Sequence, residues 1–438
     1  MEGSALTVVS PSGVRGVFGS DLSPDMLIGL ARNFATEFGE GEILLARDTR
    51  ASSPIVSRLA GGATLGAGVN VVDYGVISTP ALFRESRKTD KSAIMVTASH
   101  NEPEWNGLKF IVRGRGINQE QLDSISMKSK DGGPVVSGSL RKAEGFAYNS
   151  DLVAMAGEDS ARGVKVVLDL NGGAAIGHAP EILRSLGCEV LTIGDMPGTF
   201  NRTVDPTNDP LDLLCKTVKR EGAHAGFAFD SDGDRLVLVD NEGKKRTGDY
   251  MLSLAFKEML QSQEEKQVVV SVDTSQAVDD VLGEFGGRVY RAKVGEANVV
   301  GMLLAKEVRI GGEGSSAGLI DASFNYCRDS LLAATTIVAA LKKKGVKLYG
   351  QVKSYHQARL TLELPRAKAL KVMKRLQKEL KGADALDGLK VKTSKSSWVL
   401  LRSSNTEDGV RVSAEAATAK DAEQLAKTYL AKARRAAA

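Results

Sequence analysis

The chain has 438 residues, which is more than one ordinary hydrophobic core can organise, so we expect roughly two to four domains. Its hydrophobic content of 42% and charged content of 26% are typical of a soluble globular protein. The net charge of +4 mildly favours anionic partners and is too small to indicate nucleic-acid binding. No apolar stretch approaches the roughly 18 residues of a membrane span, and the N-terminus lacks a signal-peptide pattern. We therefore expect a cytoplasmic protein with no membrane partner.

Cysteine and histidine are scarce in this sequence. Cys188, Cys215 and Cys327 are odd in number and far apart, which argues against a disulfide framework. The chain contains only four histidines, which argues against a metal site built from imidazole ligands.

One strand pattern recurs three times along the chain. An apolar run meets a polar loop at 43–46, 166–168 and 268–272. A helix-length stretch and a second strand-like run follow each of them, at 69–72, 189–191 and 288–290. Each copy adds a third run that also ends at a polar loop, at 93–96, 225–229 and 308–310. Strands separated by helices predict mainly parallel sheets, and three copies predict three related α/β domains whose third loops meet if the domains surround one cleft.

We place the domain boundaries so that the chain divides into residues 1–150, 151–246, 247–354 and 355–438. In the last segment, a basic amphipathic helix at 366–381 precedes a strand at 397–401 and a helix at 420–435, which predicts a small α+β domain. The apolar face of the basic helix is predicted to comprise Leu370, Val372, Met373, Leu376 and Leu380. Its charged face is interpreted as solvated surface, because no aromatic residues interleave the charges.

A candidate nucleophile follows the third run of the first copy. Ser99 and His100 lie just beyond the apolar run at 93–96, and Lys109 follows in the next strand-like stretch. The carboxyl ends of buried parallel strands are where chemistry reaches water, and these neighbours have the chemistry to activate a serine or to hold an anion on its oxygen. The alternative is an ordinary Ser/Thr-rich turn with a bend at Asn106 and Gly107.

Asp230, Asp232 and Asp234 alternate in a short loop between two strand-like runs. Three carboxylates this close repel one another unless a cation lies among them, and oxygen ligands suit Mg²⁺ or Ca²⁺. An EF-hand requires glycine and glutamate where this chain has Arg235 and Asn241, so we reject that motif. The remaining alternative is a solvated acidic turn.

Two further loops have the composition of a binding site. A cationic loop contains Arg402, Ser403, Ser404, Asn405, Thr406 and Arg411, whose side chains suit a phosphate group, although a polar hairpin loop is the alternative. A glycine-rich loop at 311–318 allows a ligand to approach the backbone, and its Glu313 is a candidate acceptor for sugar hydroxyls. Arg15 is a further candidate phosphate contact, or a plain turn arginine.

Together these loops resemble those of the α-D-phosphohexomutase family, which comprises phosphoglucomutases, phosphomannomutases and phosphoglucosamine mutases. The matching segments, in chain order, are TASHNEPEWNGLKF for the phosphoserine loop, FDSDGDR for the metal loop, GGEGSSAG for the sugar loop and RSSNTEDGVR for the phosphate loop. The resemblance spans nearly the whole chain. It implies four domains around a central cleft, of which three are related α/β units.

The resemblance also implies a mechanism. Ser99 would carry a phosphate, and an oxygen of this phosphoserine would join Asp230, Asp232 and Asp234 around Mg²⁺. The phosphoryl group would pass to a hexose phosphate, and the resulting hexose 1,6-bisphosphate, which also primes the enzyme, would turn end for end. Lys109 matches a family general acid/base, which His100 would assist. Mg²⁺, Arg235 and Lys109 would neutralise the transferred phosphoryl group, and Arg15 is a further catalytic candidate as a phosphate contact. Glu313 and Ser315 would bind the sugar, and the phosphate loop would bind the non-reacting phosphate.

This chain departs from the family pattern at several positions. Ala317 stands where many members have a histidine, and Asp408 stands where the phosphate loop usually has proline. The sugar loop without that histidine is reminiscent of archaeal members. Two other readings stay open: a haloacid-dehalogenase-type phosphatase that uses Asp230 as its nucleophile, and a sugar-phosphate-binding protein without catalysis. The preferred sugar (glucosamine, mannose or glucose phosphate) and the oligomeric state are also open.

Overall fold

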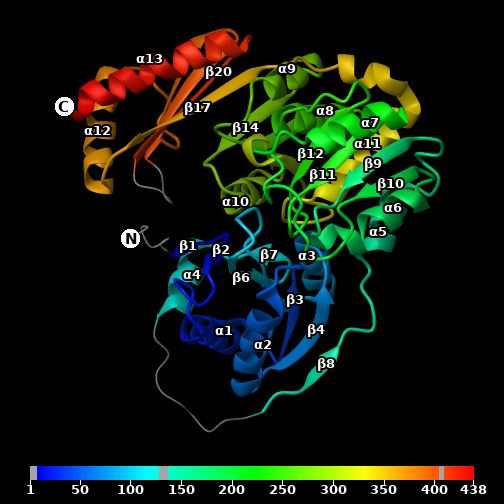
Figure 1. Ribbon diagram of the computed structural model, residues 1–438. Helices are drawn as coiled ribbons and strands as arrows, with labels where there is room; N and C mark the ends of the chain where they lie inside the picture. The colour runs from blue at the N-terminus through cyan, green and yellow to red at the C-terminus, as the bar shows by residue number, and fades with distance from the viewer. Residues whose placement is uncertain (1–6, 128–136, 404–408) are drawn as a thin grey trace.

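Three α/β sheets and one antiparallel sheet form the molecule (Figure 1). The structure is a computed structural model that describes residues 7–127, 137–403 and 409–438. Sheet I has eight strands, of which seven follow the order β1-β2-β6-β5-β3-β4-β8, with β7 paired to β6. Their bounds are Val8–Ser10 (β1), Gly13–Val17 (β2), Glu42–Arg47 (β3), Asn70–Val76 (β4), Ser92–Val96 (β5), Trp105–Val112 (β6), Arg115–Gly116 (β7) and Leu140–Lys142 (β8).

Sheets II and III have four strands each, in the orders β10-β9-β11-β12 and β14-β13-β15-β16. The strands of sheet II are Lys165–Asp169 (β9), Glu189–Ile193 (β10), Ala225–Phe229 (β11) and Leu236–Asp240 (β12). Those of sheet III are Gln267–Ser271 (β13), Arg288–Ala292 (β14), Ile310–Glu313 (β15) and Gly318–Asp321 (β16). The middle of sheet I, β4-β3-β5-β6, repeats the same arrangement: the first strand lies between the second and third, all parallel, and an antiparallel strand follows. The predicted threefold repeat is confirmed.

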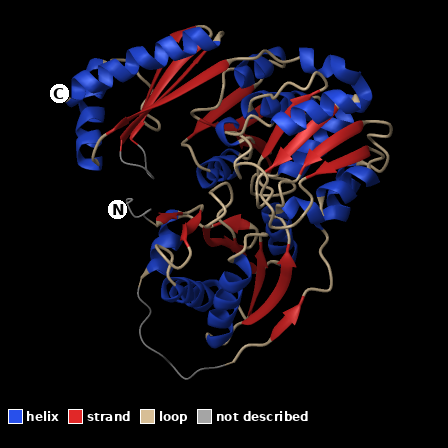
Figure 2. Cartoon of the chain, viewed as in Figure 1, coloured by secondary structure: helices blue, strands red, loops and turns tan. Residues whose placement is uncertain are grey.

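Helices cover these sheets (Figure 2). Those around sheet I are Pro24–Phe38 (α1), Ser53–Gly66 (α2), Thr79–Thr89 (α3) and Gln119–Ser126 (α4). Those around sheets II and III are Tyr148–Ala156 (α5), Ala179–Ser185 (α6), Asp212–Glu221 (α7), Gly248–Leu260 (α8), Ala277–Glu284 (α9), Glu296–Lys306 (α10) and Ser330–Lys344 (α11), with 3-10 turns at Ala174–Gly177, Gly314–Ser316 and Gly345–Gly350. In the described parts of the chain, no helix has both the length and the apolarity needed to cross a membrane.

Residues 356–403 and 409–438 form the C-terminal unit, which is the predicted α+β domain. Its antiparallel sheet has the order β17-β20-β19-β18, with strands His356–Glu363, Gly409–Ala416, Ser397–Ser403 and Leu389–Ser394 in that order. Helices Arg366–Glu379 (α12) and Ala419–Ala437 (α13) pack on it. Leu370 was expected on the apolar face of α12 and is 48% exposed, so that prediction is wrong. Ala369, one residue earlier, is buried instead, because the stripe it forms with Val372 and Leu376 follows the helical period.

The sugar-loop strand also differs from its prediction. The apolar run at 308–310 predicts a strand that ends before the glycines, whereas β15 begins at Ile310 and continues through Gly311 and Gly312 to Glu313. A β-carbon at Gly312 would overlap the Gly318 carbonyl and Leu252. The glycines therefore allow close packing inside the strand.

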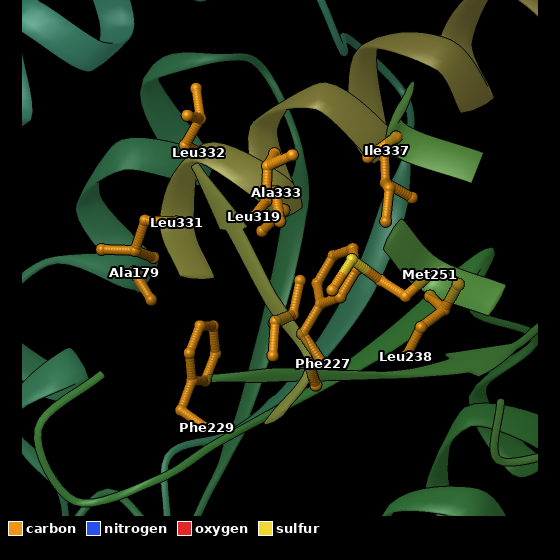
Figure 3. Close-up of a cluster of buried hydrophobic side chains, with 14 of the residues drawn as sticks. Ala179, Phe227, Phe229, Leu238, Met251, Leu319, Leu331, Leu332, Ala333 and Ile337 are labelled. Carbon is orange, nitrogen blue, oxygen red and sulfur yellow. The ribbon is translucent and has the colours of Figure 1, made fainter. Parts of the chain in front are cut away.

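Sheets I, II and III share one continuous apolar core. Figure 3 shows Phe227 and Phe229 of β11 in the same layer as Leu319 of β16 and Leu331 of α11. The same cluster reaches Leu82 and other buried residues of the first unit. Because these units bury their apolar surfaces against one another, separating them would expose that core to water.

The C-terminal unit has its own core and joins sheet III through a small contact. Trp398 and Leu400 pack on Val272 in a separate cluster, and the Trp398 indole donates to the buried Glu415 carboxylate at 2.8 Å. The backbone N–H of Gln276 donates to the same carboxylate at 2.8 Å. A few directed contacts, rather than a shared core, therefore hold this unit on the rest of the molecule.

A glycine in sheet I provides a test of the packing around β2. A β-carbon at Gly107 would overlap the carbonyl oxygen of Val14 on the neighbouring strand, whereas a β-carbon at Gly62, exposed in α2, would contact nothing within 4 Å. We expect Gly107→Ala to destabilise the fold by about 1–3 kcal/mol, since overpacking displaces backbone. Gly62→Ala should leave stability unchanged or raise it by up to about 1 kcal/mol. Thermal unfolding of both variants checks this, and equal midpoints would contradict it.

The interface between sheet III and the C-terminal unit should also respond to pH. Burial, with Glu415 nearby, raises the pKa of Asp249 to about 7. The folded state therefore holds this proton more tightly than the unfolded chain, and stability is lost as pH rises from about 4 to about 7. Asp249→Asn removes the free-energy cost of ionising this buried carboxyl group, so the unfolding midpoint should rise at pH 8. The gain should be smaller at pH 5, because the carboxyl group is protonated there. A gain of equal size at both pH values would contradict the assignment.

Candidate active site

Ser99 lies just beyond the end of β5, in a backbone conformation that is unusual for serine. Its φ of 52° is in the left-handed region, which costs a non-glycine residue about 1–2 kcal/mol. The Thr97 hydroxyl accepts the Ser99 N–H at 2.8 Å, and the Ser99 hydroxyl donates to Oδ2 of Asp230 at 3.0 Å. The strained turn therefore directs the serine oxygen toward the metal-loop carboxylates.

Arg50 stabilises this turn through hydrogen bonds to its backbone carbonyls. Its side chain is fully buried, pairs with Asp48 at 3.0 Å, and donates through Nη2 to the carbonyls of Ser99 at 2.6 Å and Asn101 at 2.7 Å. A buried arginine that donates to backbone carbonyls fixes the positions of these carbonyls, because moving them away would leave the buried positive charge without hydrogen-bond partners. In the sequence Arg50 belongs to the polar loop after the first strand, and no motif distinguished it from other loop arginines.

Asp230, Asp232 and Asp234 converge in the turn between β11 and β12. All three are buried, and one ligand oxygen from each lies within 4.8 Å of the others. Oδ2 of Asp232 accepts from Lys109 Nζ at 2.7 Å, and Oδ2 of Asp234 accepts from the same Nζ at 3.0 Å. Oδ1 of Asp232 and Oδ1 of Asp234 are buried and have no hydrogen-bond partner among the described residues. Oxygens of this kind are what a hard divalent cation requires, so the residues fit Mg²⁺.

The charges of this cluster are partly balanced by the protein itself. Burial raises the pKa of Asp230 well above its ordinary value, and Asp234 and Asp232 raise it further. Burial has the same tendency at Asp234, but Arg328 and Lys109 outweigh it and hold the pKa of that carboxyl well below its usual range. Burial lowers the pKa of Lys109, yet Asp232 and Asp234 together raise it above its ordinary value. Lys109 is therefore a cation between two carboxylates.

Two arginines and a histidine face the same cluster. Arg235 pairs with Asp205 at 2.8 Å, and its Nη2 lies 2.8 Å from Nδ1 of His100. Burial lowers the pKa of His100 well below its ordinary value, and Arg235 and Arg15 lower it further, so the imidazole is neutral. Arg15, on β2, is buried and donates through Nη2 to the Ser12 carbonyl at 2.8 Å. The Nε atoms of Arg15 and Arg235 are buried without a hydrogen-bond partner in the described chain, which suits an anionic ligand.

The sugar-loop glutamate lies next to this group of charges. Glu313 ends β15, is 3% exposed, and accepts the Gly295 N–H at 2.7 Å. Arg328 lies 3.6 Å from its other oxygen and 2.8 Å from Asp234. Ser315 is half-buried in the following 3-10 turn, and it lines a cavity of about 380 Å³ together with Asp249 and Arg359. The glycine-rich loop and the metal loop are therefore connected by one guanidinium.

The phosphate-loop residues fall at the β19–β20 hairpin. Arg402 and Arg411 are register partners on the two strands, and Ser403 ends β19. Arg402 pairs with Asp387 at 3.1 Å, and the same carboxylate accepts the Val294 N–H at 2.9 Å. Ser404, Asn405, Thr406 and Asp408 lie outside the described residues.

The structure thus brings Ser99, His100, Lys109, Arg235 and the aspartate trio into one contact network, with Glu313 at its edge. Arg15 is near enough to interact electrostatically with Asp232 and Asp234. The site also contains two residues that the sequence analysis did not select. Arg328 pairs with Asp234, and the Thr79 hydroxyl donates to Asp232 at 2.5 Å. Arg328 precedes Asp329, the N-cap of α11, and a charged pair before a helix is too common to single out. Only the fold identifies these residues.

A serine hydroxyl on a carboxylate, carboxylate oxygens left open for a cation, and buried guanidinium donors are features that suit a divalent metal and an anionic ligand. Comparison with known proteins specifies the class. Four models of phosphoglucomutase/phosphomannomutase domains match the chain: α/β/α domains I, II and III at residues 8–133, 147–243 and 247–358, and the C-terminal domain at 360–432. The chain belongs to this α-D-phosphohexomutase family of isomerases.

Individual relatives agree with the family assignment. The chain is 32% identical over 436 residues to the "Probable phosphoglucosamine mutase" of Methanopyrus kandleri, covering 94% of this chain and 95% of the relative. A crystal structure of a phosphoglucomutase/phosphomannomutase family protein from Burkholderia thailandensis superposes with a TM-score of 0.84 at 25% identity, covering 98% and 97% of the two chains. An Aspergillus fumigatus N-acetylphosphoglucosamine mutase, solved with GlcNAc-6P and magnesium, shares the fold with a TM-score of 0.62 at 13% identity, covering 99% and 96%.

The open aspartate oxygens predict metal-dependent stability. Adding Mg²⁺ to metal-free protein should raise the unfolding midpoint, since a ligand at 100 times its Kd stabilises the native state by about 2.7 kcal/mol. Asp234→Asn should lose most of this shift, because an amide is a weaker ligand for a hard cation than a carboxylate. Asp195→Asn, at an exposed position, serves as the control and should keep the shift. Thermal unfolding with and without Mg²⁺ measures the effect, and an undiminished shift in Asp234→Asn would contradict the site.

Proposed function

We propose that this protein interconverts hexose 1-phosphate and hexose 6-phosphate through a phosphoserine at Ser99 and a hexose 1,6-bisphosphate intermediate. The observation that carries the proposal is the Ser99 hydroxyl at 3.0 Å from Asp230, beside Lys109 and the aspartate trio, in a chain of this family. A serine in this position accepts a phosphoryl group where cations are already arranged to neutralise it.

Asp232 and Asp234, with their open Oδ1 atoms, would hold Mg²⁺ together with Asp230 and an oxygen of the phosphorylated Ser99. When bound, the ion would neutralise negative charge that develops on the transferred phosphoryl group. Magnesium in the crystal structure of the Aspergillus relative supports this choice of cation. The Oδ2 atoms of Asp232 and Asp234 both accept from Lys109, so a cation at the Oδ1 atoms would not compete with the lysine for the same oxygen.

The protein's own groups supply the remaining charge and protons. Arg15 and Arg235 offer unpartnered Nε donors for the phosphoryl oxygens. Lys109, held protonated by its carboxylate neighbours, would protonate the serine oxygen as the phosphoryl group leaves it and would take up the proton of the attacking sugar hydroxyl, so that the lysine ends each transfer as it began. His100 accepts from Arg235 at Nδ1, so the neutral ring carries its proton on Nε2 and can donate a hydrogen bond from there to a phosphoryl or sugar oxygen. Lys109 would then take the acid/base role that a histidine at position 317 would otherwise share.

The remaining loops orient the sugar. Glu313 and Ser315 would contact its hydroxyls, and the phosphate loop would bind the non-reacting phosphate in both orientations of the intermediate. This loop comprises Arg402, Ser403, Ser404, Asn405, Thr406 and Arg411. The bisphosphate has to turn between the two transfers, which requires the C-terminal unit to move away and return. The small contact between Trp398, Leu400 and Val272 is compatible with such a hinge.

We propose glucosamine phosphate as the first substrate to examine, because the Methanopyrus kandleri relative carries the name of a phosphoglucosamine mutase. Mannose and glucose phosphates are the alternatives within the same family. Membership of this family also supports the cytoplasmic location that the sequence predicts.

The proposal predicts that Ser99→Ala loses at least about 10³-fold in turnover, since no other hydroxyl replaces the nucleophile. The assay supplies glucosamine, mannose and glucose 1-phosphates separately, with the matching 1,6-bisphosphate as primer and with Mg²⁺. Ser150→Ala, at an exposed helical position, is the matched control and should retain full turnover.

Labelling the enzyme with radioactive bisphosphate distinguishes the rival chemistries. A phosphoserine survives hydroxylamine, whereas an aspartyl phosphate on Asp230 is cleaved, so loss of label would favour the phosphatase. Binding of all three sugar phosphates without turnover would favour a protein that has lost catalysis.

A further inference from the structure

Arg328 is buried among three carboxylates: those of Asp234 in the metal loop, Glu313 in the sugar loop and Glu296 at the start of α10. It lies between β16 and α11, where it pairs through Nη2 with Asp234 at 2.8 Å and through Nε with Glu296 at 3.2 Å. Its Nη1 lies 3.6 Å from Oε2 of Glu313. Its own backbone N–H also donates to Glu296 at 2.9 Å, so the residue is anchored at both ends.

The sugar loop makes room for this side chain. A β-carbon at Gly318 would overlap the methylene groups of Arg328, which therefore lie directly on the Gly318 backbone. The preceding residue, Ala317, is fully buried and carries only a methyl group. Arg328 thus brings a positive charge into the sugar loop, whose own residues from 311 to 318 include no cation.

Glu313 depends on this charge more than the other two carboxylates do. Asp234 also contacts Lys109, and the Glu296 side chain is 18% exposed to water. Glu313 is almost fully buried, and among the described residues its side chain also accepts the Gly295 N–H at 2.7 Å and the Ser316 hydroxyl at 3.4 Å. Burial raises the pKa of Glu313 and Arg328 opposes this rise. Without the guanidinium, a carboxylate offered to sugar hydroxyls would be left buried with little compensation.

We propose that Arg328 is a positioning residue for sugar recognition, which uses Asp234 and Glu296 as anchors to hold the Glu313 carboxylate in the orientation that binds the sugar. The inference rests on the proposed function of the site. It makes sugar recognition depend on the metal loop, because the same guanidinium contacts both. Arg328 touches neither the reacting phosphoryl group nor the sugar in this account, and it acts through Glu313.

The test compares Arg328→Lys and Arg328→Met with Arg309→Lys, a matched substitution of an arginine that pairs with Asp321 at a 40% exposed position of the same unit. At saturating Mg²⁺, Arg328→Met should raise KM for glucosamine 1-phosphate by about tenfold or more. The reason is that a misplaced Glu313 would lose its hydrogen bond to the sugar, and a hydrogen bond to a charged group is worth about a decade in affinity. Turnover should fall by less than KM rises. Arg328→Lys should recover part of the loss, and Arg309→Lys should stay within about twofold of the parent.

A double-variant cycle separates positioning from simple loss of structure. If Arg328 acts through Glu313, adding Arg328→Lys to Glu313→Gln should change KM by no more than about twofold beyond Glu313→Gln alone. Full additivity of the two substitutions would overturn the inference. Calorimetric binding of glucosamine 1-phosphate to the same variants in the Ser99→Ala background provides the same comparison without turnover.

Other outcomes remain interpretable. If Arg328→Met does not fold, Arg328→Lys and Glu296→Gln decide the question, because both weaken the anchoring and retain the packing volume. Unchanged KM and unchanged calorimetric affinity in both, with only a lower unfolding temperature, would show a merely structural role and overturn the inference. If the parent protein converts none of the three hexose 1-phosphates, the proposed function fails, and the calorimetric comparison alone then supports or overturns the role of Arg328.

Discussion

The structure depends on balancing the negative charge of three buried carboxylates. Asp230, Asp232 and Asp234 are at most 1% exposed, and isolated ionised groups in such a position would cost several kcal/mol each. Lys109 comes from sheet I and Arg328 from the unit built on sheet III, so cations from two other units help to compensate the metal loop. The requirement for charge compensation therefore joins three parts of the chain at one point.

The repeated strand order explains how they meet. In each α/β sheet the third strand lies beside the first and is followed by an antiparallel strand, so a tight loop falls at its carboxyl end. Those loops carry Ser99, the aspartate trio and Glu313 in turn. The core shared by the three sheets fixes their relative positions, because any rearrangement would expose residues such as Phe227 and Phe229. The repeated strand order places a similar loop in each of the three units, and the shared apolar core brings these loops together.

The parts that the sequence predicts are those with a local pattern. Buried strands of parallel sheets are continuous apolar runs, which is why the three-copy organisation can be read directly from the chain. The aspartate trio and the serine loop are compact motifs, and their members stay adjacent after folding. Arg328 and Arg50 are single arginines that contact the site through residues far away in the sequence, Asp234 for Arg328 and the Ser99 carbonyl for Arg50, so no local spacing indicates their roles. Leu370 was misplaced for a related reason: its neighbour Ala369, a weaker apolar signal, faces the core instead.

The C-terminal unit follows a different physical logic from the other three. Its contact with sheet III consists of a small apolar cluster and a few polar contacts, such as that of the Gln276 N–H with the Glu415 carboxylate, and their loss costs much less than opening the shared core. Asp387 makes another of these contacts, because its carboxylate accepts the Val294 N–H of sheet III's loop and also pairs with Arg402 of the β19–β20 hairpin. Arg402 uses Nη2 for Asp387, and its Nε is buried without a hydrogen-bond partner among the described residues. If Arg402 binds a substrate phosphate, as the proposed function requires, the phosphate would bring negative charge next to the Asp387 carboxylate. Val294 is followed by Gly295, whose N–H donates to Glu313, so the contact at Asp387 lies one residue away from a partner of the sugar loop. Under the proposed function, ligand binding at this hairpin would therefore act on the same carboxylate that joins the C-terminal unit to sheet III.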